Sequence, residues 1–218
     1  MSERLELTEP QLERYSRQIL VSNFGAHGQL RVLHSEIVIS GRGSLTEALA
    51  SSLARAGVGQ LRLAETLISA LTKRETWPDT RLSPLEGLLL SGRPSLFIDT
   101  SFSLPDWHRI FLSSPYRPTA LWVRAASSHG LVGVAPSPEL SPSCAGWFHA
   151  FVAEQTATGE PLDSLQWCAS WAAALALRYI VAPCPLRTPM LFRYDTRTGE
   201  IEQIHEQERF RCGYCGRN

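Results

Sequence analysis

The sequence has very few lysines and no long hydrophobic run. Lys73 is the only lysine, so arginine supplies the rest of the 21 basic residues, which 21 acidic residues balance to a formal net charge of zero. This balance excludes a broad electrostatic attraction to nucleic acid or to an anionic membrane. The longest apolar run, residues 171–177, is much shorter than the roughly 20 residues of a bilayer-spanning helix, and residues 1–6 lack the apolar stretch of a signal peptide. We therefore expect a cytoplasmic protein that binds neither nucleic acid nor a membrane.

Cysteines are also few. Their number, five, is odd and fits reduced thiols or a metal site better than a disulfide framework. Cys212 and Cys215 have the spacing of zinc ligands, but one pair supplies only two of the four that tetrahedral zinc needs. Cys144 and His149 are candidates for the other half, whereas Cys168 lies on the apolar stripe of an amphipathic helix, where we expect a buried side chain.

The clearest structural signal is a strand, a glycine turn, a helix and a second strand within about 30 residues. Residues 36–40 form a short β-branched run, and Gly41 and Gly43 follow it. Apolar residues then recur at helical spacing until Gly57, and residues 60–64 alternate as a strand. This order is the βαβ unit that opens a dinucleotide-type fold.

The remaining pattern predicts one domain, residues 1–218, with an α/β fold: a Rossmann-like, mostly parallel sheet with flanking helices. We expect residues 1–33 to form a helical arm, 34–135 a degenerate nucleotide-binding core, and 136–218 a crossover, a helix, a β-hairpin and the Cys-x-x-Cys tail. After Glu65 the order loosens, and residues 66–94 hold three prolines and one short helix near 85–90, which is too little for another full α/β repeat. Strands are expected at 95–99, 119–123 and 129–134, the helix at 162–181 and the hairpin at 190–204.

The glycine turn is a candidate phosphate loop. Gly41 and Gly43 let backbone N–H groups approach an anion at a helix N-terminus, although Thr46 stands at the third position and a tight turn without a ligand explains the pattern equally well. Asp99 ends a buried strand, where open α/β sheets place ligand groups, but an acid there also caps turns. These features alone leave open a Rossmann oxidoreductase that holds an adenosine ribose with Glu65.

Taken in order, the motifs resemble the ThiF/MoeB/HesA family, the prokaryotic relatives of ubiquitin-activating enzymes. Residues 13–20 (Glu-Arg-Tyr-Ser-Arg-Gln-Ile-Leu), followed by Phe24-Gly25 and Gly28-Gln29, are nearly the family's opening segment. The glycine turn, residues 97–100, the helix 170–180 and the tail from Tyr194 to Cys215 continue the resemblance over most of the chain. The opening and the closing Cys-x-x-Cys do not belong to Rossmann oxidoreductases, so that alternative ranks last.

The resemblance implies an activity and its partners. Family members bind ATP·Mg²⁺ and adenylate the C-terminal glycine carboxylate of a ubiquitin-like sulfur carrier or of a small peptide. The carboxylate attacks the α-phosphorus and pyrophosphate leaves, so cations and Mg²⁺ must neutralise the developing charge.

This sequence departs from the family at the nucleotide site. Ser44 and Thr46 replace loop glycines, and we expect their side chains to intrude on the path of the phosphates. Glu65 matches the ribose-binding acid and Leu67 replaces the next one, while Lys73 and Arg74 retain positive charge where the family has an Asn-x-x-Arg-Gln segment. The paired acids of the metal site are reduced to Asp99, because Phe102 stands at the second position, and a single carboxylate is a poor anchor for Mg²⁺. We therefore expect weak or absent ATP and Mg²⁺ binding.

The structural zinc site implied by the resemblance is incomplete as well. Where the family has its first Cys-x-x-Cys, this chain has Cys144 and Trp147, so at most three thiolates come from Cys144, Cys212 and Cys215. Either His149 completes a Cys₃His site or a tryptophan-packed knot replaces the metal.

One element of the machinery is intact. The resemblance implies that Arg17 reaches across a dimer interface to the phosphates in the partner's site. In the alternative interpretation, Arg14 and Arg17 are solvent-exposed helix charges without such a role. The sequence therefore predicts a non-catalytic subunit that forms a homo- or heterodimer with a family member and supports its adenylation of a carrier or peptide. The alternative is a divergent but active ATP-dependent adenylyltransferase that works as a homodimer.

Overall fold

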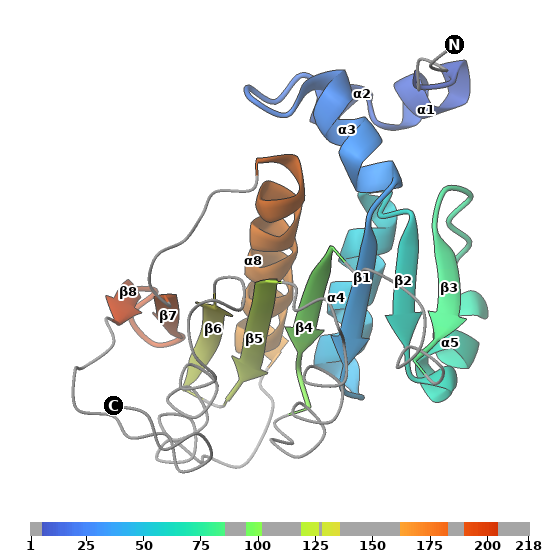
Figure 1. Cartoon of the computed structure of the whole chain (residues 1–218). Helices are drawn as coiled ribbons and strands as arrows, with labels where there is room; N and C mark the ends of the chain where they lie inside the picture. The colour runs from blue at the N-terminus through green and yellow to red at the C-terminus, as the bar shows by residue number, and fades with distance from the viewer. Residues whose placement is uncertain are drawn as a thin grey trace.

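A single mixed sheet organises the chain. The computed structural model describes residues 6–85, 95–101, 119–126, 128–135, 162–182 and 190–204. Within these ranges eight strands form one sheet in the order β3-β2-β1-β4-β5-β6-β7-β8. Helices α4 (Ser44–Arg55) and α8 (Leu162–Val181) pack against one face of the sheet (Figure 1). The predicted Rossmann-like α/β fold is confirmed, and no helix in the described ranges is long and apolar enough to cross a membrane.

The parallel half of the sheet defines where a ligand would bind. It consists of β3 (Arg81–Pro84), β2 (Gln60–Leu63), β1 (Glu36–Ser40), β4 (Leu96–Asp99) and β5 (Thr119–Ala125). The chain moves outward from β1 to β3 and then returns to the other side of β1 as β4, so the strand order reverses between β1 and β4. Open α/β sheets bind ligands outside the carboxyl ends of the strands at such a reversal. Ser40 and Asp99, the last residues of β1 and β4, lie opposite each other there.

The other half of the sheet is antiparallel. Strand β6 (His129–Ala135) pairs with β5 and with β7 (Met190–Asp195), and β7 pairs with β8 (Ile201–Ile204) at the edge. One carboxylate oxygen of Asp195 accepts hydrogen bonds from the backbone N–H groups of Arg197 and Thr198, which fixes the turn between β7 and β8. The predicted hairpin is confirmed.

The core lies between the sheet and its two long helices. Alternate residues of β1 and β4, among them Ile39 and Ile98, are fully buried together with Leu49 and Leu53 of α4. Cys168 of α8 is buried, as predicted, and burial raises the pKa of its thiol to about 12. This thiol packs so closely on β6 that a Cβ at Gly130 would lie 2.5 Å from its Sγ.

The segment after Glu65 holds more regular structure than the sequence predicted. Helix α5 (Glu65–Thr72) and the parallel edge strand β3 form a further α/β repeat, so the expectation that residues 66–94 lack one is wrong. Leu67 and Leu71 of α5 are buried, and their spacing of four residues is the helical signal. Pro84 ends β3 at the sheet edge, where a missing N–H disrupts no ladder.

The N-terminal arm is helical, as predicted, in three pieces. Helices α1 (Glu9–Arg14), α2 (Ser16–Ile19) and α3 (Gly25–Leu33) lie at the end of the sheet where the parallel strands begin (Figure 1). Helix α3 leads directly into β1, and the backbone N–H of Gly59, just before β2, donates to the carbonyl of Val32. The arm and the carboxyl ends of the parallel strands are therefore at opposite ends of the molecule.

Candidate functional site

The glycine turn between β1 and α4 packs tightly on the residues that follow β4. Gly41 has φ +131° and Gly43 has φ +90°, conformations that side chains disfavour. A Cβ at Gly41 would lie 1.9 Å from Thr100 Oγ1, whereas a Cβ at Gly43 would meet no atom within 4 Å. Gly41 is therefore required by the approach of the turn to Thr100, a contact within the protein.

Hydrogen bonds of the Thr46 and Thr100 hydroxyl groups hold the inner side of this turn against the end of β4. Thr100 Oγ1 donates to the carbonyl of Ser40 at 2.9 Å and lies 2.7 Å from Thr46 Oγ1, so Thr46 is the donor in the second bond. The Thr46 side chain is fully buried. We expected the Thr46 side chain to intrude on the path of the phosphates, and this expectation is wrong. The side chain points into the protein and joins α4 to the end of β4. Ser44, by contrast, is exposed at the start of α4.

Asp99 belongs to the same network. Its Oδ1 accepts three hydrogen bonds, from Ser40 Oγ and Ser101 Oγ at 2.6 Å and from the Ser101 N–H at 2.9 Å. The residue is only 1% exposed. Mg²⁺ keeps several waters and binds accessible carboxylates, so this buried carboxylate, whose Oδ1 already accepts three bonds, does not fit it. The geometry fits the capping role of an acid after a strand, and Phe102, the position of the missing second acid, lies outside the described residues.

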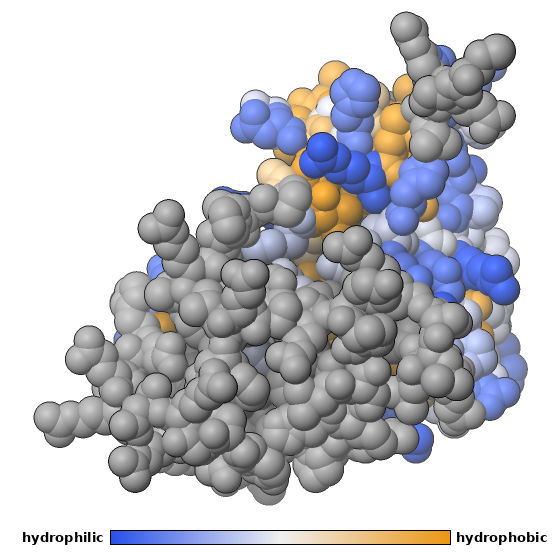
Figure 2. Space-filling model, in the orientation of Figure 1, coloured by the Kyte–Doolittle hydropathy of each residue, from blue (hydrophilic) through white to orange (hydrophobic). Residues whose placement is uncertain are grey.

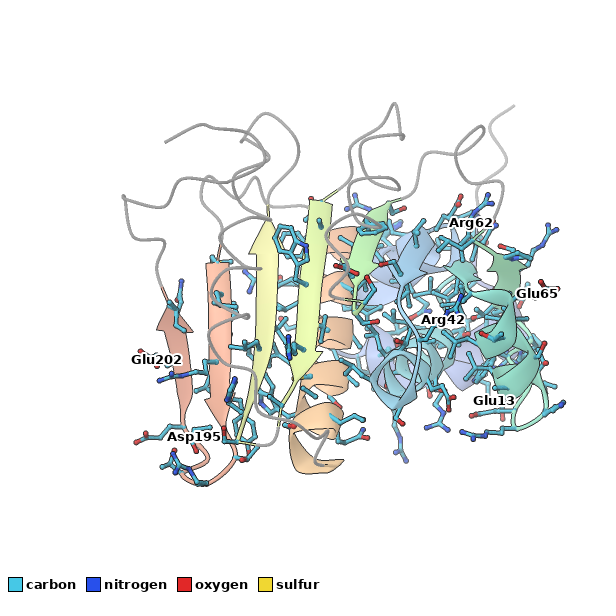
Figure 3. All side chains as sticks on the ribbon, turned by 90° about the horizontal axis from the view of Figure 1, so that it is seen from below. Glu13, Arg42, Arg62, Glu65, Asp195 and Glu202 are labelled. Carbon is cyan, nitrogen blue, oxygen red and sulfur yellow. The ribbon has the colours of Figure 1, made fainter. Side chains whose placement is uncertain are left out.

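Two features at this end of the sheet remain open to solvent. Helix α4 begins after Gly43 without a side-chain cap, and Arg42, Gly43 and Ser44 are exposed. Glu65 is exposed at the start of α5, immediately after β2, and Figure 3 labels it together with Arg42. An uncapped helix N-terminus carries unsatisfied N–H donors and a partial positive charge.

The predicted cations are not gathered at this opening. Lys73 and Arg74 follow α5, about 12 Å along the helix from Glu65 by the rise of eight residues. Arg74 Nη1 is 2.9 Å from Glu47 Oε2 in the first turn of α4, so an acid of the same chain already compensates its charge. Lys73 is exposed. The structure thus separates the ribose-type acid from the two cations that the sequence grouped with it.

At the opposite end of the sheet, Tyr15 anchors the arm. Its side chain is 2% exposed, and its hydroxyl donates to Asp79 Oδ2 at 2.9 Å. The ring packs on Gly57, where a Cβ would lie 2.6 Å from Tyr15 Cζ. Burial, together with the bond to Asp79, raises the pKa of Tyr15 to about 12.

Asp79 collects the other polar contacts of the arm. Gln11 Nε2 donates to its Oδ1 at 3.0 Å, and Arg14 forms an ion pair with its Oδ2. Burial opposes ionisation of Asp79, but the hydrogen bonds from Gln11 and Tyr15 and the charge of Arg14 outweigh it and lower the pKa of the carboxyl. Sequence reasoning missed this contact because Asp79 lies 64 residues from Tyr15 in a proline-containing loop.

Arg17 differs from Arg14 in its surroundings. It lies in the four-residue helix α2, its side chain is exposed, and it forms no ion pair with the residues that the structure describes. Because the arm and the glycine turn are at opposite ends of the sheet, Arg17 does not reach the turn of its own chain.

The predicted zinc ligands lie outside the described residues. These are Cys144, Cys212 and Cys215, together with His149. In the described ranges no group of three or more His, Cys, Asp or Glu side chains is arranged to hold a metal ion.

Comparison with known proteins finds a likeness that covers the N-terminal part of the chain in sequence. Residues 15–66, which include Tyr15, the glycine turn and β2, match the model of the ThiF family. The protein "Adenylyltransferase and sulfurtransferase MOCS3" of Drosophila willistoni is 48% identical over 58 residues, which are 27% of this chain and 13% of that protein. "Protein HesA, heterocyst" of Trichormus variabilis is 44% identical over 59 residues, which are 27% of this chain and 22% of that protein.

Solved structures extend the likeness over almost the whole chain. E. coli MccB in complex with N-formylated MccA has a TM-score of 0.67 at 14% identity and covers 93% of this chain and 75% of that one. PaaA has a TM-score of 0.64 at 15% identity, covering 92% and 75%. At such identities the likeness shows the fold. The family model matches residues 15–66, and the sequence relatives, adenylyltransferases among them, are similar to 27% of the chain, so the sequence likeness to the ThiF family is shown for this N-terminal part.

Proposed function

We propose that this chain is a non-catalytic member of the ThiF family that supports adenylation by a partner subunit and contributes Arg17 to it. One observation carries the proposal. Arg17 is exposed on an anchored arm and has no ion pair among the described residues, while Thr46 and Asp99, at the end of the sheet where a nucleotide would bind, are buried and bonded to their own chain.

The chemistry explains why a lone arginine is useful to another subunit. In adenylation a carboxylate oxygen bonds to the α-phosphorus of ATP and pyrophosphate departs, so negative charge shifts onto the leaving oxygens. A guanidinium stays charged at any working pH and forms two parallel hydrogen bonds to phosphate oxygens. Supplied in trans, such an arginine needs a fixed position, which Tyr15 and Asp79 give to the helix that precedes α2.

The glycine turn supports the other half of the proposal. A phosphate-binding turn needs free space beside its backbone and acids that are open to a metal ion. Here Gly41 is pressed against Thr100 and the Asp99 carboxylate accepts three bonds from its own chain. These contacts support the inference that this chain's own turn does not hold ATP·Mg²⁺.

Carboxylate-dependent exchange of pyrophosphate into ATP tests the proposal. We expect an intact ThiF-type subunit, given a carrier or peptide ending in glycine, to exchange faster when this chain is added. Arg17→Ala should remove that stimulation, whereas Arg197→Ala, an exposed arginine at the far β7–β8 turn, should preserve it. Stimulation that survives Arg17→Ala contradicts the proposal.

The uncapped start of α4 favours a second candidate, a divergent active adenylyltransferase. The exposed N-terminus of α4 and the exposed Glu65 are the two elements at the strand ends that still suit a nucleotide. In this case the isolated chain catalyses pyrophosphate exchange, and Asp99→Ala abolishes it while the variant remains folded by circular dichroism. Exchange by this chain alone would decide in favour of the second candidate.

A further inference from the structure

A cluster of polar side chains lies on the antiparallel half of the sheet, away from the N-terminal arm. Figure 2 shows hydrophobic surface gathered near the arm, at the top of the view, to which the proposed function assigns a partner subunit. The polar cluster lies instead on strands β5, β6 and β7. A site formed by these strands is independent of Arg17.

The strand register brings two arginines and a histidine to one position of the sheet. Gly130 of β6 packs against helix α8, so the side chains of its neighbours His129 and Leu131 project from the opposite face. Paired residues of neighbouring strands share a face, which places Arg124 of β5 and Arg193 of β7 on either side of Leu131. Two strand spacings, about 10 Å, separate the Cα atoms of these arginines. Both side chains therefore reach a small ion above Leu131.

The imidazole of His129 has one nitrogen without a partner. The residue is 8% exposed, and its buried Nε2 forms no hydrogen bond. Its Nδ1 lies 3.0 Å from Ser128 Oγ. When the serine hydroxyl donates to Nδ1, the ring hydrogen is on Nε2, and this N–H lacks an acceptor. Because a buried donor without an acceptor opposes folding, an acceptor bound beside Nε2 stabilises this part of the sheet.

The charges around His129 favour an anion as that acceptor. Burial lowers the pKa of the His129 imidazole, and the charges of Arg193 and Arg124 lower it further. Asp195 opposes this shift, but its Oδ1 already accepts hydrogen bonds within the β7–β8 turn. Glu202 is the other acid that the described residues of β5 to β8 present on this face, and it pairs with Arg193 at 2.6 Å. Positive charge therefore predominates beside Nε2.

We propose that Arg124, His129 and Arg193 bind a small oxyanion, which is a carboxylate or a phosphate group. One oxygen accepts the hydrogen bond from His129 Nε2, and the two guanidinium groups donate to the same anion from the neighbouring strands. The side chain of Arg193 is 39% exposed, so the site is open to solvent on the β7 side. The bound anion joins three strands of the antiparallel half and raises the stability of the fold by mass action.

NMR titration of the full chain with sodium acetate or sodium phosphate, observed at the His129 ring, tests the site. Titration with sodium chloride at equal ionic strength is the reference. We expect saturable shifts and a higher pKa of His129 in the complex, because an adjacent anion favours the protonated imidazole. A response to acetate alone identifies a carboxylate site, a response to phosphate alone identifies a phosphate site, and a response to both identifies a general oxyanion site.

Side-chain variants locate the bound anion. Arg124→Gln and Arg193→Gln each remove a charged hydrogen-bond donor and should weaken binding about tenfold or more. The increase in the thermal unfolding midpoint that the anion causes should become smaller in parallel. Arg55→Gln is the matched control, because it removes the same charge from an exposed position on α4, which covers the other face of the sheet.

Three outcomes overturn the proposal. It fails if acetate and phosphate act no differently from chloride, or if the anion binds without changing the signals of the His129 ring. It also fails if a folded Arg124→Gln or Arg193→Gln variant binds the anion as tightly as Arg55→Gln does. Should Arg124→Gln not fold, Arg193→Gln decides, because its side chain is partly exposed. None of these outcomes bears on the proposed function, since the site lies apart from Arg17.

Discussion

The two ends of the parallel sheet differ in whether their polar side chains are bonded within the chain or exposed to solvent. At the carboxyl end, Ser40, Thr46 and Asp99 form hydrogen bonds within the chain. These bonds make a closed junction between the glycine turn and the end of β4. At the amino end, Tyr15 and Asp79 bond to each other, and Arg17 on the anchored arm is exposed and forms no ion pair with the part of the chain that the structure describes. The comparison shows that the polar residues at the carboxyl end are engaged within the chain, whereas Arg17 at the amino end remains exposed.

The largest expected effect concerns Arg17. Removal of an arginine that stabilises transferring phosphates lowers rates by about 10³-fold or more, so Arg17→Ala should reduce the stimulation of a partner's pyrophosphate exchange by that order. Arg17→Lys keeps the charge but loses the two-point contact, and we expect an intermediate rate. Equal rates for the lysine and alanine variants would show that charge at this position is not used.

Gly41 tests the closed junction through stability. Gly41→Ala places a Cβ against Thr100 at a positive φ, and we expect a loss of about 2–4 kcal/mol in the free energy of unfolding, measured with urea. Gly43→Ala is the matched control: φ is also positive but no atom lies within 4 Å, so about 1 kcal/mol is expected. Similar losses in both variants would mean that Thr100 does not press on Gly41.

Substitutions of Thr46 test the same junction and should cause a smaller loss of stability. Thr46→Val keeps the shape but removes the donor to Thr100, so we expect about 1–2 kcal/mol lower stability in urea unfolding. Thr46→Ser retains the hydroxyl and should lose less. A valine variant as stable as the unmodified protein would remove Thr46 from the junction.

Substitution of Asp79 should have the smallest effect on stability, and this effect should depend on pH. Its pKa is lowered in the folded protein, so its contribution to stability is fully present above the unfolded value of about 3.9 and is lost as pH falls through the lower folded value. Thermal unfolding between pH 6 and pH 3 should show a smaller acid-induced decrease in Asp79→Asn than in the unmodified protein. Tyr15→Phe should lower stability by about 1 kcal/mol near neutral pH, because it removes one hydrogen bond to Asp79. Unchanged acid sensitivity in Asp79→Asn would separate Asp79 from the anchoring of the arm.

Local patterns were enough to predict most of the fold. The β-branched run before Gly41, the apolar spacing in α4 and α8 and the hairpin around Asp195 are short-range signals, and the structure confirms them. Helix α5 and strand β3 were missed because each is short and two prolines flank or end them.

The candidate site was less predictable, because its contacts join distant parts of the chain. The sequence identified Thr46 as a departure from the family's glycine loop and Asp99 as the remaining acid of its metal site. It did not predict their bonds, because Thr46 and Thr100 are 54 residues apart and Ser40 and Asp99 are 59 residues apart. The same holds for Tyr15 and Asp79, which are 64 residues apart. Arg17, in contrast, was identified through the resemblance of residues 13–20 to the opening segment of the family, and the structure shows that it is exposed.

Titration calorimetry of the isolated chain with ATP·Mg²⁺ shows whether its glycine turn binds a nucleotide. Because Thr46 and Thr100 hold the glycine turn against the end of β4 and Asp99 is buried and bonded to Ser40, we predict no binding heat at micromolar to submillimolar nucleotide. Saturable binding with a micromolar Kd, lost on Gly43→Ala or Glu65→Ala, would show that the turn still holds a nucleotide and would contradict the account.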